Sequence, residues 1–82
     1  MSFKKLQVNI IIFGQLKDIT GSDLVRLTDI ADTNELVKEL NKTYPAMMAA
    51  NYLIAVHKQV VLENTLLTNN STVALLPPFS GG

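Results

Sequence analysis

The sequence predicts a single α+β domain in which one main helix packs across a mixed β-sheet. Three observations support this fold class. Apolar residues alternate with period two near the start of the chain, one later segment carries apolar residues at helical spacing, and further β-rich segments follow it. The 82 residues suffice for one domain with a modest core. A hydrophobic fraction of 48% is typical of an ordered domain rather than of a disordered chain.

The first strand is predicted over residues 6–13, and a second strand fits residues 23–28. Alternate residues of the first strand are expected to face the core: Leu6, Val8, Ile10 and Ile12. Its opposite face begins polar and becomes apolar at Ile11 and Phe13. Gly14 ends the strand, and residues 15–21 form a turn or a short helical segment.

The main helix is predicted over residues 33–43. Asp32 followed three residues later by Glu35 resembles a capping box, in which side chains satisfy backbone N–H groups at a helix start. Pro45 ends the helix, because proline disfavours helical geometry in the preceding residue. Residues 46–50 are small and apolar and fit one further helical turn. The apolar residues at helical spacing are Leu36, Val37, Leu40 and Tyr44.

Three more strands are predicted after the helix. The β-rich segments 53–57 and 60–63 are close enough to form a hairpin with its turn at Lys58-Gln59. Asn69-Asn70 favours another turn, because asparagine tolerates left-handed backbone conformations. A last strand follows over residues 72–76. The predicted order is therefore β-β-α-β-β-β.

Composition excludes several kinds of function. Seven basic and seven acidic residues cancel and are scattered, so we expect no nucleic acid and no membrane as a partner. The chain has no cysteine, which excludes disulfides, thiolate metal sites and a cysteine nucleophile. The first residues, M-S-F-K-K-L-Q-V-N-I, resemble neither a signal peptide nor a membrane span. We therefore expect a cytoplasmic protein.

Catalytic and metal-binding patterns are not evident either. His57 is the only histidine and lies beside the predicted hairpin turn, without a recognisable nucleophile and orienting carboxylate. Glu35 and Glu39 lie four residues apart with lysines nearby, as on a solvated helix face. Gly14 and Gly21 are isolated rather than parts of a phosphate-binding loop. We expect no metal, no bound cofactor and no catalysis by this chain alone.

The sequence ends in L-L-P-P-F-S-G-G, which predicts a flexible tail over residues 77–82. The two prolines favour an extended segment, and the phenylalanine offers one apolar anchor to a partner. The glycines lack side chains, so this end of the chain fits a narrow cleft. Such a tail delivers a carboxylate that must be activated before it can react, and the chain has no nucleotide-binding motif of its own. The tail residues are Pro77, Pro78, Phe79, Ser80, Gly81 and Gly82.

The stretch V-A-L-L-P-P-F-S-G-G resembles the C-terminal signature of the small subunit of molybdopterin synthase, the MoaD family of ubiquitin-like sulfur carriers. The resemblance extends over essentially the whole chain, through F-G-Q-L-K, the helix at residues 35–40 and A-V-H-K-Q. It implies a β-grasp (ubiquitin-like) fold with a single domain over residues 1–82. The strand order predicted above agrees with this fold.

The resemblance also implies a function. In the family, a ubiquitin-activator-like adenylyltransferase uses ATP to adenylate the terminal glycine, here Gly82, and sulfur then replaces one oxygen to give a thiocarboxylate. The tail inserts into the large synthase subunit, with Gly81 allowing its passage. There the sulfur is donated to a cyclic pyranopterin monophosphate and forms the dithiolene of molybdopterin, in molybdenum cofactor biosynthesis. Catalytic groups are expected on the large subunit, in a heterotetramer of two small and two large subunits.

The family further implies a partner interface on this chain. Phe13, Val60 and Leu76 stand where relatives expose an apolar patch. Phe13 and Leu76 are out of phase with the expected core residues beside them, but burial in the core is the alternative for all three and has equal weight for Val60. Lys17 stands where relatives often carry arginine, and it either pairs with an acid of a partner or is a free surface lysine.

Other functions stay open at this point. A sulfur carrier for thiamine synthesis or tRNA thiolation would share the fold, although thiamine carriers generally lack the diproline. A ubiquitin-like protein modifier would start from the same adenylate, and a plain interaction domain would not use its tail. His57 replaces a common asparagine, and N-N-S at residues 69–71 replaces a common acidic-Gly-acidic turn, so no particular subfamily is assigned.

Overall fold

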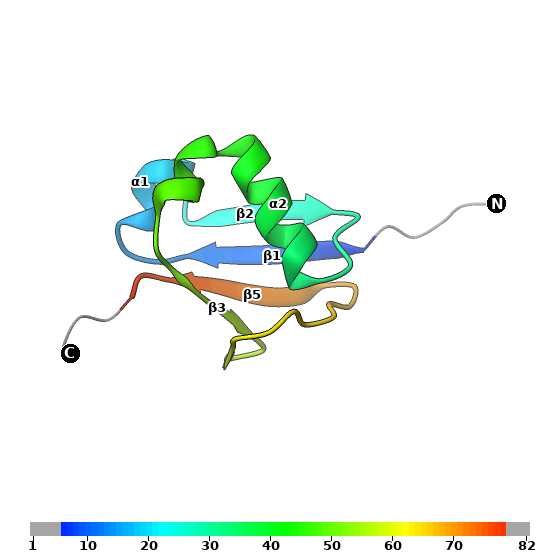
Figure 1. The fold of residues 1–82 in the computed structure, drawn as a ribbon. Coiled ribbons are helices and arrows are strands. Elements are labelled where there is room, and N and C mark those ends of the chain that lie inside the picture. Colours follow the sequence, from blue (N-terminus) through cyan, green and yellow to red (C-terminus); the bar gives the residue numbers. More distant parts are fainter. Residues whose placement is uncertain (1–5, 79–82) are drawn as a thin grey trace.

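The computed structural model describes residues 6–78 and has the α+β architecture that the sequence predicts (Figure 1). Five strands form one sheet in the order β2-β1-β5-β3-β4. The elements are β1 (Gln7–Ile12), α1 (Leu16–Thr20), β2 (Leu24–Thr28), α2 (Thr33–Thr43), η1 (Pro45–Ala49), β3 (Leu53–Val56), β4 (Gln59–Val61) and β5 (Ser71–Leu76). The predicted order of strands and main helix is confirmed, and both short helical segments form where the sequence favoured them.

The two central strands determine where the tail begins. β1 and β5 are parallel, whereas β2 pairs antiparallel with β1, and β3 pairs antiparallel with both β5 and β4. Because parallel strands end at the same edge of a sheet, β1 and β5 finish side by side (Figure 1). We call this edge the tail edge. The residues after β5, Pro77 and Pro78, and the turn that leads from β1 into α1 both lie there.

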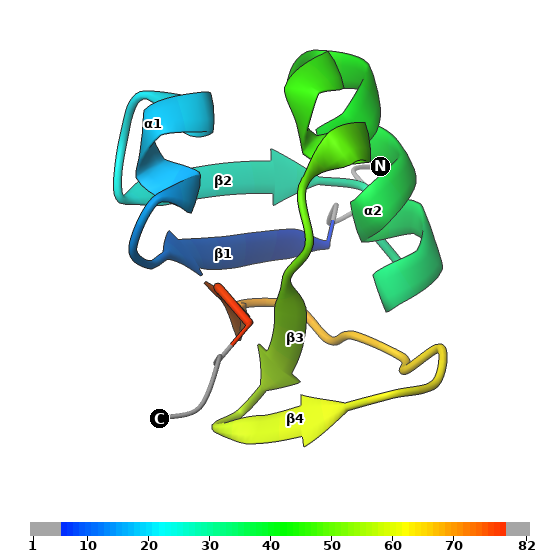
Figure 2. The same ribbon diagram turned by 60° about the vertical axis from the view of Figure 1, so that its left-hand side comes forward.

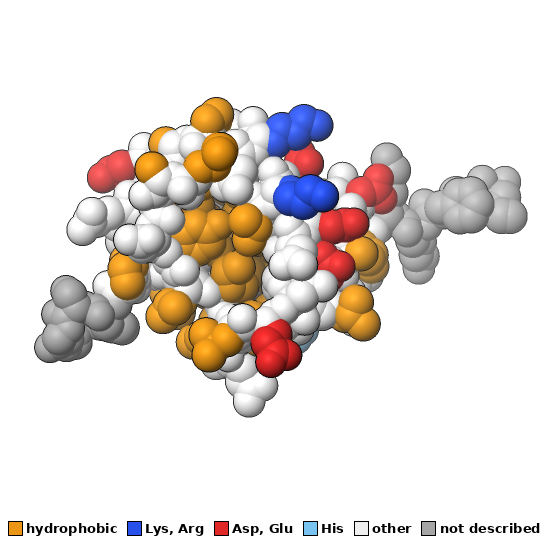
Figure 3. All heavy atoms as spheres, in the orientation of Figure 1, with side chains coloured by type: hydrophobic (Ala, Val, Ile, Leu, Met, Phe, Trp, Pro, Cys, Tyr) orange, Lys and Arg blue, Asp and Glu red, His pale blue; other side chains and the backbone are white. Residues whose placement is uncertain are grey.

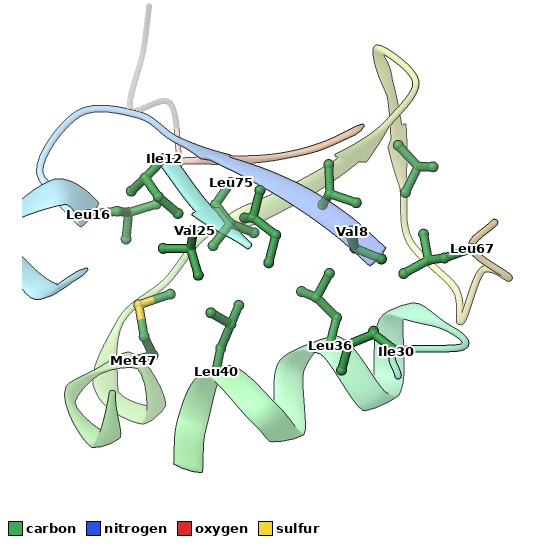
Figure 4. Close-up of a cluster of buried hydrophobic side chains, with 13 residues drawn as sticks. Val8, Ile12, Leu16, Val25, Ile30, Leu36, Leu40, Met47, Leu67 and Leu75 are labelled. Carbon is green, nitrogen blue, oxygen red and sulfur yellow. The ribbon is translucent and has the colours of Figure 1, made fainter. Parts of the chain in front are cut away.

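The core lies between the sheet and α2. Leu36 and Leu40 are fully buried on α2 and point toward the sheet (Figure 4). Complete burial of such a side chain contributes roughly 1.5–3 kcal/mol. Three predicted core residues of β1 are also buried, Val8, Ile10 and Ile12, while Leu6 before the strand is half-buried. Figures 1 and 2 place α1 and α2 on the same side of β1 and β2, so the helices leave the opposite face of these strands uncovered.

The start of α2 follows the predicted capping pattern with one difference. The Asp32 carboxylate accepts the backbone N–H of Glu35 at 2.9 Å, as expected for a helix cap. The Glu35 carboxylate accepts the N–H of Ala31 at 3.1 Å, one residue before the position that a capping box uses. Both interactions are local in sequence, which is why the helix start was predictable.

The predicted Lys58-Gln59 turn is wrong. Val56 pairs with Gln59, so the two turn residues are His57 and Lys58, with φ of 50° and 69°. This register places Val61 opposite Ile54, and both side chains pack against the core. A turn at Lys58-Gln59 would instead place Glu63 opposite Ile54. β4 accordingly ends at Val61 rather than at residue 63.

Candidate functional site

The open face of the sheet carries a continuous apolar row. Residues paired across neighbouring strands point to the same face. Ile11 pairs with Leu24 on one side and with Ala74 on the other. Ala74 pairs in turn with Ala55, and Ala55 pairs with Val60. The row therefore crosses all five strands, on the face opposite to the α2 core.

A second apolar row lies at the tail edge. Leu76, the last residue of β5, pairs with Leu53. Ile12 and Leu75 are paired and buried on the core face. Successive residues of a strand point to opposite faces, so Phe13 and Leu76, which follow them, point to the open face. The Phe13 N–H donates to the Leu75 carbonyl at 3.1 Å, which extends the β1–β5 ladder as far as this row.

These two rows form a surface that we call the open-face patch: Ile11, Phe13, Leu24, Leu53, Ala55, Val60, Ala74 and Leu76. Its most exposed members are Phe13, Leu24 and Val60, at 44%, 41% and 51% of their surface. The next row along the strands is polar, since Asn9 pairs with both Arg26 and Thr72. Apolar patches of this kind on small domains mark interaction sites. The patch is thus confined to the half of the face nearest the tail edge.

The structure brings together the three apolar residues that the sequence singled out. Phe13 and Val60 are exposed, Leu76 is half-buried, and all three belong to the open-face patch rather than to the α2 core. Lys17 lies on α1, and its side chain is exposed. That these four residues contact a partner stays a prediction. Sequence periodicity indicated the exposed face of β1, but the other patch residues emerge only from long-range strand pairing.

The first tail residues lie against the body of the domain. Pro77 is half-buried and Pro78 is exposed. Both line a groove of about 460 Å³ at the tail edge, together with Leu16 and Ile19 of α1 and with Asn51 before β3. The remaining predicted tail residues lie outside the described residues: Phe79, Ser80, Gly81 and Gly82. The flexibility of the tail therefore stays a prediction.

The side of the molecule that carries the helices has both charged and apolar surface, unlike the open-face patch. In Figure 3, charged side chains gather on one part of this face, and apolar side chains are visible in a hollow beside them. A groove of about 360 Å³ runs between α2 and β3, with Val37, Tyr52 and Ile54 among its lining residues. Burial raises the pKa of the Tyr52 hydroxyl above its usual 10.0. Met48 on η1 is 72% exposed on the rim.

The described part of the chain, residues 6–78, shows neither a metal site nor a membrane-spanning helix. Within it, no group of three or more His, Cys, Asp or Glu side chains is placed to hold a metal ion. No helix there is long and apolar enough to cross a membrane.

The fold places the chain in a known structural class. A five-stranded mixed sheet with one main helix across it is the ubiquitin-like β-grasp arrangement, and solved structures of that class superpose on the chain. Putative molybdopterin converting factor subunit 1 from Pyrococcus furiosus matches with a TM-score of 0.80 at 21% identity, over 90% of this chain and 99% of that one. Small archaeal modifier protein 1 from Methanosarcina acetivorans matches with a TM-score of 0.78 at 21% identity, over 98% and 100%. The predicted β-grasp fold is thus confirmed.

Sequence comparison narrows the class to a family. The model of the ThiS family matches residues 10–82, and the chain belongs to this family. The molybdopterin synthase sulfur carrier subunit of Haemophilus influenzae is 26% identical over 80 residues, which cover 92% of this chain and 99% of that protein. The subunit of the same name from Dictyostelium discoideum is 25% identical over 83 residues, which cover 93% and 96%. The resemblance predicted from the tail motif is therefore confirmed.

A third solved structure contains a structurally similar chain together with a partner. It is the complex of subunits 1 and 2 of molybdopterin-converting factor from Helicobacter pylori. The matched chain superposes with a TM-score of 0.72 at 22% identity, over 94% of this chain and all of that one.

Proposed function

We propose that this chain is a sulfur carrier, the small non-catalytic subunit of molybdopterin synthase in molybdenum cofactor biosynthesis. The observation that carries the proposal is the family match through residue 82, because the matched segment includes the whole P-P-F-S-G-G motif. The two sequence relatives, both matched over nearly their whole length, are sulfur carrier subunits of that synthase.

The proposed chemistry takes place at the carboxylate of Gly82. An adenylyltransferase of the ubiquitin-activator kind joins this carboxylate to the AMP part of ATP and releases pyrophosphate. Sulfide supplied by a sulfur donor then attacks the acyl carbon and displaces AMP, which leaves a thiocarboxylate. Activation is needed because a free carboxylate resists attack by a nucleophile. The sulfur finally passes to a cyclic pyranopterin monophosphate, and water supplies the oxygen that returns the end of the carrier to a carboxylate. The catalytic groups of this step belong to the large subunit, and the carrier itself binds no cofactor.

The arrangement of patch and tail supports this role. The open-face patch reaches the same edge of the sheet at which the tail begins, so one partner can bind the body through the patch while it receives the tail. Binding energy from the body is then used to position the reacting group, which is how remote contacts favour a reaction. The Helicobacter pylori complex supports a large-subunit partner for the present chain. We propose a cytoplasmic heterotetramer of two small and two large subunits.

A ubiquitin-like modifier is the second candidate. The observation in its favour is the superposition on small archaeal modifier protein 1. The modifier would use the same adenylate but would be joined to lysine side chains rather than donate sulfur. Both sequence relatives favour the carrier, and the diproline argues against a thiamine carrier.

Reconstitution tests the proposal. The chain is incubated with the adenylyltransferase, ATP and a sulfur donor, and then with the large subunit and cyclic pyranopterin monophosphate. We expect the intact chain to yield molybdopterin and a chain lacking Gly82 to yield none, although both have the same circular dichroism spectrum and melting temperature. Molybdopterin formation by the shortened chain would contradict the proposal. Transfer of the intact chain to lysines, without molybdopterin, would favour the modifier.

A further inference from the structure

The turn after β1 contacts the first residue of the tail. Gly14 has φ of +61°, a left-handed value that residues with a Cβ rarely adopt. A Cβ built on Gly14 would lie only 2.7 Å from Cγ of Pro77. Backbone conformation and available space therefore both require glycine at this position. Sequence reasoning identified Gly14 only as the end of a strand, because nothing local indicates that residue 77 lies against it.

Backbone hydrogen bonds on both sides of Gly14 define its position. Phe13, directly before Gly14, donates its N–H to Leu75 at 3.1 Å. The Gly14 carbonyl accepts the N–H of Lys17 at 3.2 Å, which closes the turn into α1. Pro77 follows β5 directly and is half-buried. The ring of Pro77 therefore lies against the Gly14 backbone at the point where the chain leaves the sheet.

We propose that Gly14 is a positioning residue that, through Pro77, sets the direction in which the tail leaves the domain. This inference rests on the proposed function, since the direction matters only if Gly82 must reach a partner's site. A methyl group at Gly14 would require Pro77 to move by about 1 Å to reach ordinary contact distance. The five residues after Pro77 span up to roughly 18 Å when extended, so a tilt at Pro77 displaces Gly82 further.

Gly21 provides a matched control. Its φ of +77° is also left-handed, but nothing lies within 4 Å of a Cβ built there. Alanine at either glycine introduces the same kind of backbone strain, and only the Gly14→Ala substitution displaces Pro77. A comparison of the two variants separates tail position from general destabilisation.

Adenylation kinetics test the inference. Initial rates with the adenylyltransferase and ATP give kcat and KM for each variant. Because the open-face patch is intact, we expect Gly14→Ala to lower kcat by about tenfold or more with little change in KM. Gly21→Ala should stay within about twofold of the unsubstituted chain. Equal kcat values for the two variants would overturn the inference.

Removal of the Pro77 ring gives a rescue experiment. In a Pro77→Ala background, the ring atom that meets the new methyl group is gone. Gly14→Ala should then lower kcat by no more than Gly21→Ala does in the original chain. The same tenfold loss in both backgrounds would show that Gly14 does not act through Pro77, and would overturn the inference.

A direct structural readout separates this inference from the proposed function. Proton NMR should show a nuclear Overhauser contact between Hα of Gly14 and Hγ of Pro77. The contact should persist in Gly21→Ala. In Gly14→Ala the new methyl group replaces the Hα that faces Pro77, so the readout is a shift of the Pro77 ring resonances, which Gly21→Ala should leave unchanged. If the original chain shows this pattern but is not adenylated, the proposed function fails while the role of Gly14 in directing the tail stands. If the original chain is adenylated but lacks the contact, the inference fails and the proposed function stands.

Discussion

Asn64 joins the loop after β4 to the start of α2. Its Oδ1 accepts the backbone N–H of Asn34 at 2.8 Å and the hydroxyl of Thr33 at 3.2 Å. The Thr33 hydroxyl oxygen in turn accepts the N–H of Thr65 at 2.9 Å. The first backbone N–H groups of a helix have no partner within the helix, so an external acceptor stabilises its start. A single side chain thereby supports both the helix and a long loop.

We expect Asn64→Ala to lower the free energy of unfolding by about 1 kcal/mol, because it removes the acceptor at the start of α2. Asn34→Ala is the matched control. The Asn34 side chain is exposed, and its backbone N–H survives the substitution, so the change should stay within about 0.5 kcal/mol. Urea denaturation of the three proteins measures both effects. Equal stability of the two variants would contradict the role given to Asn64.

The residues at the start of α2 also show what sequence can predict at this scale. Asp32 accepts the N–H of Glu35, only three positions away, so the spacing in the sequence predicted this helix cap. Asn64 lies about thirty residues from its partners, and no local pattern indicates that contact. The same holds for Gly14 and Pro77, which chain topology brings together from opposite ends of the domain.

At the scale of elements, the β3–β4 hairpin turn contains two non-glycine residues in left-handed conformations. His57 and Lys58 have φ of 50° and 69°. Two-residue hairpin turns prefer Asn-Gly at these positions, because both require positive φ. Periodicity predicted that both strands exist but not their bounds or the turn, since neither candidate pair carries a favoured turn residue. Packing of Val61 opposite Ile54 accounts for the observed choice.

We expect Lys58→Gly to stabilise the domain by about 0.5–1 kcal/mol, because it relieves left-handed strain in the folded state. Gln59→Gly should instead destabilise the domain by a similar amount, because Gln59 is the first residue of β4 and pairs with Val56. Urea denaturation compares the two. Stabilisation by Gln59→Gly and not by Lys58→Gly would contradict the observed turn and favour the turn at Lys58-Gln59 that the sequence predicted.

At the scale of the whole molecule, the two faces of the sheet serve different purposes. One face packs against α2, and the other carries the open-face patch up to the tail edge. Alternation in β1 already put Phe13 out of phase with the core residue Ile12, but it left burial of Phe13 in the core as an alternative. The extent of the patch was not predictable, because it depends on the parallel pairing of β1 with β5, two strands at opposite ends of the chain. The fold class and the tail motif were therefore readable from sequence, whereas the patch and the Gly14 contact required the structure.

Val60→Asp tests the role of the patch. We expect at least about a tenfold loss of affinity for the large subunit, because the substitution places a charge in an apolar contact. Met48→Asp is the control, since Met48 is exposed on η1 on the helix side. It should leave the affinity unchanged, and both variants should keep the original melting temperature because neither side chain is buried. Isothermal titration calorimetry gives the affinities, and equal losses for the two variants would contradict the assigned surface.

The intact mass of the protein tests the claim that Gly82 carries sulfur. The protein is purified from its own cells without thiol reagents. We expect a fraction that is heavier by the exchange of one oxygen for one sulfur, and that is absent when Gly82 is removed. Only the unmodified mass, from cells whose adenylyltransferase is active, would contradict the claim.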